Sequence, residues 1–151
     1  MLARDIMIEQ VYKVKSSDTV RTVIEKFLKH RISGLPVVND SNQIIGYISD
    51  GDIMRYIGKH NDLVVDTIWS AFVIQGDNED FGHRLEHALR LNVLELAKRR
   101  VVTVQWNADV EDIAAVLGQK RIKKLPVERD GVLVGIISRG DVVRHAFQSI
   151  L

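Results

Sequence analysis

The sequence predicts an α+β protein made of two pseudo-symmetric βαββα repeats that pack sheet to sheet, with a helical insert between them. Three observations lead to this fold class. The chain matches itself when it is shifted by ninety positions, each copy alternates β-branched runs with an amphipathic stripe, and the stretch from 58 to 91 has no counterpart in either copy. We therefore predict repeat 1 over 1–57, the insert over 58–91 and repeat 2 over 92–151, the two repeats forming one module.

The self-match extends over most of each copy and is interrupted by the loss of one residue in a turn, "DSNQ" against "DGV". A fold tolerates a deletion at such a place. Before the turn the equivalent residues are Val11 and Val101, Val14 and Val104, Val20 and Val110, Ile32 and Ile122, Leu35 and Leu125, Pro36 and Pro126. After it they are Gly46 and Gly135, Ser49 and Ser138, Asp52 and Asp141, Arg55 and Arg144.

Both copies predict the same elements in the same order. A short β-branched strand, "VYKV" or "VVTV", leads through polar capping residues to a helix whose apolar positions follow helical spacing. A strand "LPVV" or "LPVE" then turns into "QIIGYIS" or "VLVGIIS", which indicates a hairpin. The closing helix begins at Gly51 or Gly140, with a carboxylate in its first turn, where the helix dipole favours it.

The insert predicts two helices, because two apolar stripes follow helical spacing on either side of the chain break "QGDN". We interpret Trp69 and Phe72 as residues that pack against the repeat helices, with an exposed subunit interface as the alternative. The second helix is expected to run into the start of repeat 2. The first stripe is Val65, Ile68, Trp69 and Phe72, and the second is Phe81, Leu85, Leu89, Val93 and Leu96.

Composition narrows the function classes. The 21 basic and 20 acidic residues nearly cancel, so no overall field favours nucleic acid or a membrane. The basic clusters "KRR" at 98–100 and "KRIKK" at 120–124 lack interleaved aromatic residues, which makes nucleic-acid binding unlikely. The chain has no cysteine and no apolar run near the roughly 20 residues that span a bilayer. We expect a cytoplasmic protein without a membrane partner.

No pattern of catalytic residues is present, and we assign no catalytic and no metal-binding residue. His83 and His87 lie four residues apart on an expected helix and have the spacing of a shared metal site. A solvent-facing polar stripe produces the same spacing, and we favour that interpretation.

Two stretches in each copy, "HRISGLPVVND" with "GYISDGD" and "KRIKKLPVERDG" with "GIISRGD", resemble the CBS domain, named from cystathionine beta-synthase. Their doubling resembles a CBS pair, or Bateman module, and the resemblance covers nearly all of the chain except the insert. It implies a disk-like module, often a homodimer, that binds adenine nucleotides or related adenosyl ligands in clefts between the repeats.

The residues suit that implication chemically. A carboxylate at a helix start can accept both hydroxyls of a ribose, and the serine three residues earlier can bond ribose or phosphate. The free amides of the first turn favour an anion. The alternative is that Ser, Gly and Asp simply cap the helix. Two copies that face each other favour the ligand role.

The resemblance implies two clefts, each with its aspartate from one repeat and its adenine wall largely from the other. The Asp141 cleft comprises Ser138 and Asp141, the wall Met7, Val11, Tyr12, Ile32 and Ser33, and the phosphate-contacting Lys123 and Lys124. Arg139 and Arg144 are further candidates for the same phosphates, although for Arg144 we favour packing or pairing with an acidic neighbour. The Asp52 cleft comprises Ser49 and Asp52 with the wall Ala97, Val101, Val102 and Ile122. In the Asp52 cleft, Ser33 and Gly34 occupy the positions that correspond to Lys123 and Lys124. Alternatively, the Lys123 side chain extends into this cleft from the other side.

We rank the Asp141 cleft first, because a phosphate needs cations and Asp50 would repel a triphosphate at the Asp52 cleft. The expected function is a non-enzymatic regulatory or sensor module that requires no cofactor. Its expected ligand is AMP, ADP, ATP or S-adenosylmethionine, and it would signal through a homodimer or an unidentified protein effector. A ligand-free dimerisation or scaffold module is the alternative. We expect Asp141→Ala to cost ligand affinity while leaving the melting temperature nearly unchanged.

Overall fold

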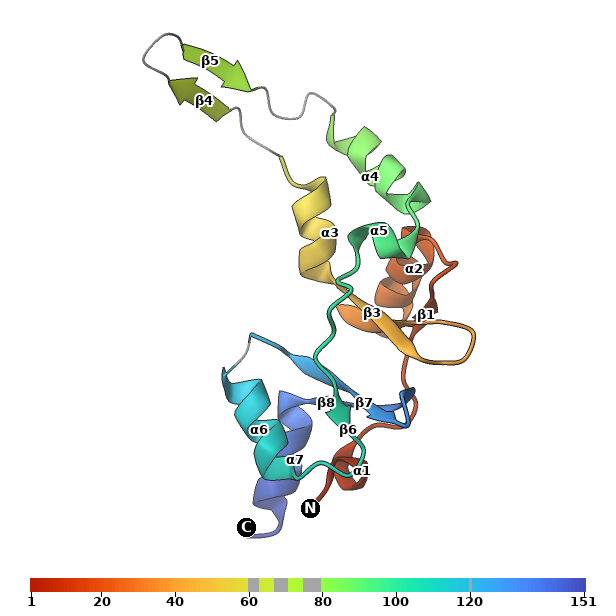
Figure 1. Ribbon diagram of the computed structural model, residues 1–151, viewed down its shortest axis with the longest axis vertical. Helices are drawn as coiled ribbons and strands as arrows, with labels where there is room; N and C mark the ends of the chain where they lie inside the picture. The colour runs from red at the N-terminus through yellow and green to blue at the C-terminus, as the bar shows by residue number, and fades with distance from the viewer. Residues whose placement is uncertain (60–62, 67–70, 75–79, 120) are drawn as a thin grey trace.

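The computed structural model describes residues 1–59, 63–66, 71–74, 80–119 and 121–151, and these form two α+β lobes (Figure 1). The first lobe contains β1 (Val14–Lys15), α2 (Val20–His30), β2 (Gly34–Val38), β3 (Ile44–Ser49) and α3 (Asp50–Ile57). The second lobe contains β6 (Val104–Gln105), α6 (Val110–Gln119), β7 (Lys124–Arg129), β8 (Val132–Ser138) and α7 (Arg139–Gln148). The order β, α, β, β, α confirms the repeat that the sequence predicts.

The two sheets have the same topology. β1 pairs parallel with β2, and β2 pairs antiparallel with β3; β6, β7 and β8 repeat this arrangement. Even the irregularity in the hairpin register recurs, between Val37 and Val38 in one lobe and between Val127 and Glu128 in the other. The duplicated sequence therefore specifies duplicated backbone geometry, including its departures from a regular ladder.

Each lobe has its own hydrophobic core between its sheet and its helices. Successive residues of β8 alternate between partly exposed and buried, so Leu133 and Ile137 face the same interior. The first core gathers Val14, Val23, Leu35, Val37, Ile48, Ile53, Ile57, Ala88 and Val93. The second gathers Ala3, Ile6, Val110, Ile113, Leu117, Leu125, Val127, Ile137 and Val142.

The two lobes exchange a short helix. α1 (Ala3–Ile6) packs into the second lobe, where the Ala3 amide donates to the carbonyl of Ala108 at 2.8 Å. α5 (Val93–Leu96) packs into the first lobe, where the Val93 amide donates to the carbonyl of Asp18 at 3.0 Å. The chain after each helix must then cross between lobes, as Figure 1 shows for the segment that leads from α5 to β6.

The insert is only partly helical. α4 (Phe81–Arg90) confirms the second expected helix, and it covers the first lobe through Ala88 and through buried Arg84, whose Nε donates to the carbonyl of Ile57 at 3.1 Å. The helix does not continue into repeat 2, because Leu91 and Asn92 are extended and Asn92 caps α5.

The first expected helix of the insert is wrong. β4 (Leu63–Asp66) and β5 (Ala71–Ile74) form an antiparallel hairpin in its place, with Leu63 opposite Ile74. Short apolar runs such as "LVVD" and "AFVI" fit a helical stripe by spacing alone, but their β-branched and aromatic content favours strands. Trp69 and the side chain of Phe72 lie outside the described residues. Among those residues, none of the helices has the length and apolar character needed to cross a membrane.

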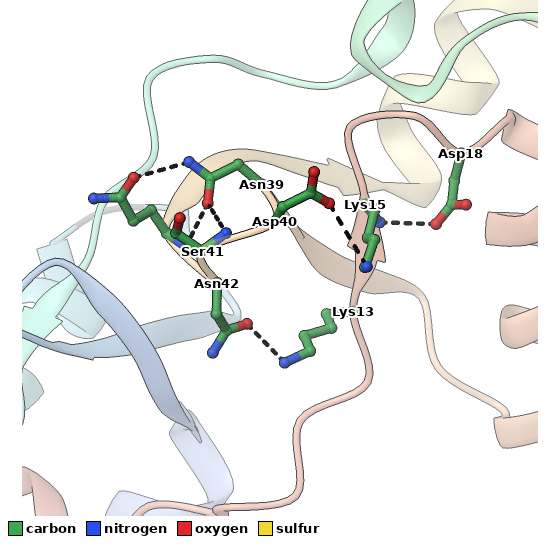
Figure 2. Close-up of polar contacts among 8 residues, drawn as sticks. Lys13, Lys15, Asp18, Asn39, Asp40, Ser41 and Asn42 are labelled. Carbon is green, nitrogen blue, oxygen red and sulfur yellow. Dashed lines mark hydrogen bonds and ion pairs between the residues drawn. The ribbon is translucent and has the colours of Figure 1, made fainter.

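A polar cluster surrounds the β2–β3 turn (Figure 2), and within it Asn42 joins the two lobes. Asn42 occupies the left-handed region at φ 60° in the β2–β3 turn, and its carbonyl and its side-chain Nδ2 contact the Leu133 backbone of β8 at 3.0 Å each. Its Oδ1 accepts from Nζ of Lys13 at 2.6 Å. Asn42 therefore connects the turn, the opposite sheet and the segment that crosses between the lobes.

We expect Asn42→Ala to lower the free energy of unfolding by about 1–3 kcal/mol, because it removes two side-chain hydrogen bonds and because alanine tolerates the left-handed region less well than asparagine. Urea denaturation measures this. Asn42→Gly should cost less, since glycine tolerates the backbone conformation. Ser41→Ala is the control and should stay near the wild type; equal losses at positions 41 and 42 would contradict this role for Asn42.

Candidate ligand-binding clefts

The start of α3 holds a closed polar cluster. Oδ2 of Asp52 accepts from the Ser49 amide at 2.9 Å and from the Ser49 hydroxyl at 3.1 Å. Oδ1 accepts from Nη2 of Arg55. The Asp52 side chain is only 3% exposed, whereas the side chain of Arg55 is 64% exposed. The carboxylate thus caps its own helix and pairs with the arginine one turn later.

The start of α7 repeats this cluster. Oδ2 of Asp141 accepts from the Ser138 amide and hydroxyl, both at 2.8 Å, and Oδ1 accepts from Nη2 of Arg144 at 2.8 Å. Burial alone raises the pKa of Asp141, but the hydrogen bonds from Ser138 and Arg144 and the charge of Arg144 outweigh it and lower the pKa below its usual value. Pairing of Arg144 with an acidic neighbour is confirmed.

These contacts limit what either aspartate can offer a ligand. A carboxylate has about four acceptor positions, and Asp141 uses two on Oδ2 and one on Oδ1. It can accept a second ribose hydroxyl only if Arg144 leaves. Because the Arg144 side chain is 69% exposed, releasing it costs little. The capping role, the alternative in the sequence analysis, is present in both copies.

The larger cleft between the lobes is a cavity of about 490 Å³. It corresponds to the expected Asp52 cleft, since Ser49, Val101, Val102 and Ile122 line it. Its lining also brings together the two basic clusters of the sequence. The basic residues are Arg55, Lys98, Arg100, Arg121, Lys123 and Lys124, and the acidic one is Asp50.

Tyr47 is the aromatic residue of the larger cleft, and sequence reasoning missed it. Its ring lies against Gly34, where an added β-carbon would come 2.7 Å from the tyrosine hydroxyl. Burial first, and then the charges of Asp50 and Asp52, raise the pKa of Tyr47 to about 12. The phenol therefore stays protonated at any ordinary pH and can donate a hydrogen bond into the cleft.

The smaller cleft has a volume of about 160 Å³ and corresponds to the wall of the expected Asp141 cleft. Val11, Tyr12, Ile32 and Lys124 line it together with Ile136. Tyr12 stacks on the His30 ring with centroids 3.8 Å apart, which covers one face of the phenol.

The residues expected to form the Asp141 cleft therefore do not all line one cavity in the structure. Ser33 and Lys123 line the larger cleft, and Lys124 lines both. Met7 lies over Gly135, where a β-carbon would come 2.5 Å from its sulfur, and Arg139 is exposed at the start of α7. On the Asp52 side, Ala97 packs beside the first core.

The two candidate metal histidines have separate partners. His83 pairs with the Asp80 carboxylate at 3.0 Å, and Nδ1 of His87 lies 3.2 Å from the Tyr56 hydroxyl. Within the described ranges, no three His, Asp or Glu side chains are grouped so that they could hold a metal ion. The spacing of His83 and His87 is therefore accounted for by other contacts.

Two pseudo-symmetric βαββα lobes, with clefts lined from both repeats, define a tandem-repeat module. The CBS domain model matches residues 3–59 and 93–147, and the chain belongs to the CBS domain family. CBS-pair proteins are in general regulatory, non-catalytic modules.

Similar proteins extend over most of the chain. The uncharacterized protein MJ1426 of Methanocaldococcus jannaschii is 33% identical over 95% of this chain and 89% of that protein. The crystal structure of CBSX2, from Arabidopsis thaliana, in complex with AMP is 27% identical over 98% of this chain and 97% of that chain, with a TM-score of 0.72. Hypoxic Response Protein I with two coordinated zinc ions is 23% identical over 96% and 98%, with a TM-score of 0.69, which shows the fold alone.

The contacts of Asp141 favour a loss of stability on its removal, rather than the nearly unchanged melting temperature that the sequence analysis expects. Because the folded pKa is lowered, the carboxylate stabilises the fold fully above its unfolded pKa of about 3.9 and loses this effect as pH falls through the folded value. We expect Asp141→Asn to cost about 1–3 kcal/mol near pH 7 and progressively less below about pH 4, by urea unfolding. Asp130→Asn, in an exposed turn, is the control. A cost that does not change with pH would contradict this account.

Proposed function

We propose that this chain is a regulatory module that binds an adenine nucleotide in the larger cleft and acts by binding rather than catalysis. The single observation that carries the proposal is the cavity of about 490 Å³ that residues of both repeats line. Ligand pockets generally have about 300–1,000 Å³, and the smaller cleft of about 160 Å³ falls below that range. The AMP complex of the similar protein CBSX2 supports the class of ligand.

The walls of the larger cleft suit the parts of a nucleotide. Val101, Val102 and Ile122 offer apolar contact to a base, and the Tyr47 hydroxyl offers a donor beside it. Ser49 and the start of α3 offer hydrogen bonds to a ribose, with Arg55 moving from Asp52 to a phosphate. After such an exchange the Asp52 carboxylate keeps the hydrogen bonds from the Ser49 amide and hydroxyl, and its Oδ1 becomes free to accept from a ribose hydroxyl.

This proposal reverses the order in which the sequence ranks the clefts. That order assumes that the Asp52 cleft lacks cations, whereas six basic residues line the cavity there. The Asp141 cleft stays the alternative site for the same ligands, or for S-adenosylmethionine.

We further propose a homodimer that passes the signal to a protein effector. Met54 on α3 and Val143 on α7 occupy equivalent positions in the two repeats, and they are 57% and 56% exposed. Equivalent apolar side chains on both lobes suit a symmetric partner, since a two-fold interface uses the same patch twice. The same observation favours the second candidate function, a ligand-free dimerisation or scaffold module. A cytoplasmic location stays a prediction of the sequence.

A matched pair of blocking variants tests the site. Val101 and Val11 are equivalent in the repeats, and each lines one cleft. We expect Val101→Trp to weaken AMP binding about tenfold or more in isothermal titration, because the indole fills the larger cavity, whereas Val11→Trp leaves it unchanged. Melting curves of both variants confirm that they fold.

Each other outcome has a definite meaning. Loss of AMP binding in Val11→Trp alone would place the ligand in the Asp141 cleft. Full binding by both variants would reject both clefts. A wild-type protein that binds none of AMP, ADP, ATP and S-adenosylmethionine would favour the scaffold.

A further inference from the structure

The larger cleft combines two basic clusters that lie far apart in the sequence. Lys98 and Arg100 follow α5, and a two-way backbone pairing holds Lys98 to Tyr47 of β3, with both N···O distances 2.9 Å. Arg121, Lys123 and Lys124 come from the segment that enters β7. Because the first cluster is fastened to one lobe and the second belongs to the other, their convergence follows from the docking of the two lobes.

These cations have no carboxylate partners among the described residues. None of the ion pairs within the described ranges involves Lys98, Arg100, Arg121, Lys123 or Lys124. Like charges around one concavity repel each other, and a concave surface concentrates their field. An anion that enters the cleft removes that repulsion, and the gain increases with the charge of the anion.

One acidic residue, Asp50, lines the same cavity. Its carboxylate accepts from the Gly51 amide at 2.8 Å, and its amide donates to the Ser33 carbonyl at 2.8 Å. The equivalent residue in the other repeat is Arg139. Arg55 is already paired with Asp52, so five other basic residues face this one carboxylate. The lining stays positive, and Asp50 moderates the attraction of an anion without reversing it.

We propose that the larger cleft selects nucleoside polyphosphates over monophosphates. The inference rests on the proposed function and deepens it, since it names the part of the nucleotide that the cleft discriminates. The adenosine part contacts the apolar wall, and the phosphate chain lies among the convergent lysines and arginines. Affinity then increases with the number of phosphates, and Asp50 limits it.

Titrations of AMP, ADP, ATP and inorganic tripolyphosphate against the full chain, in magnesium-free buffer, test this. We expect ATP to bind about tenfold or more tightly than AMP, with ADP between them. Raising the salt from about 50 to about 300 mM should reduce this ratio, because exposed charges are screened. Tripolyphosphate should bind more weakly than ATP, because it lacks the adenosine.

Neighbouring arginines provide a matched control. Arg100 lines the cleft and Arg99 does not. Substitution of either arginine removes one positive charge from the same segment, but only substitution of Arg100 removes it from the lining of the cleft. We expect Arg100→Gln to weaken ATP about three- to tenfold and AMP less than twofold, with Arg99→Gln close to the wild type. Asp50→Asn should strengthen ATP more than AMP, a gain that general damage to the fold does not produce.

Failure of this inference is distinguishable from failure of the proposed function. Equal affinity for AMP, ADP and ATP would overturn the selection by phosphate number and leave nucleotide binding intact. Tripolyphosphate that binds as tightly as ATP would overturn the assignment to a nucleoside polyphosphate. ATP binding that survives Val101→Trp would overturn the location. No binding of any nucleotide would overturn the proposed function itself.

Discussion

The exchange of short helices between the lobes is the constraint on which the clefts depend. α1 closes the core of the second lobe and α5 that of the first, so the segments that follow them must run from one lobe to the other. Those segments supply Val11 and Tyr12 to the smaller cleft, and Lys98, Arg100 and Val101 to the larger. Burial of apolar helices therefore places the cleft walls, and neither repeat alone contains a complete cleft.

The repeat made most of the fold predictable, because two copies in register report on each other's strands, turns and helices. Where there was no second copy, the prediction of α4 was confirmed but that of the first insert helix was wrong. In the insert, the spacing of the apolar residues in "LVVD" and "AFVI" predicts a helix, whereas their β-branched and aromatic content favours the strands that form. The exchange of α1 and α5 left no signal within either copy, since each helix has the same apolar pattern whichever lobe it covers.

The helix starts of the candidate site were predictable from the sequence, but the cavities were not. Ser49, Asp52, Ser138 and Asp141 occupy equivalent helix starts, and the capping geometry follows from the sequence pattern. What the pattern could not show is that each arginine occupies an acceptor position of the aspartate at its own helix start, or which way Lys123 extends from its segment. Those outcomes depend on the direction of the side chains and on how the lobes dock, and an alignment of the two repeats contains no information on either.

Divergence between the copies explains why duplicated backbones produce unlike clefts. Tyr47 stands where the second repeat has Ile136, and the ring needs the space above Gly34, whose counterpart is Lys124. That pair of changes places a phenol hydroxyl in the larger cleft, while Ile136 and Lys124 both line the smaller one. Because Lys124 borders both cavities, a ligand that draws its ammonium group toward the larger cleft also changes the charge of the smaller one. Lys124 is thus common to two clefts whose other walls have diverged.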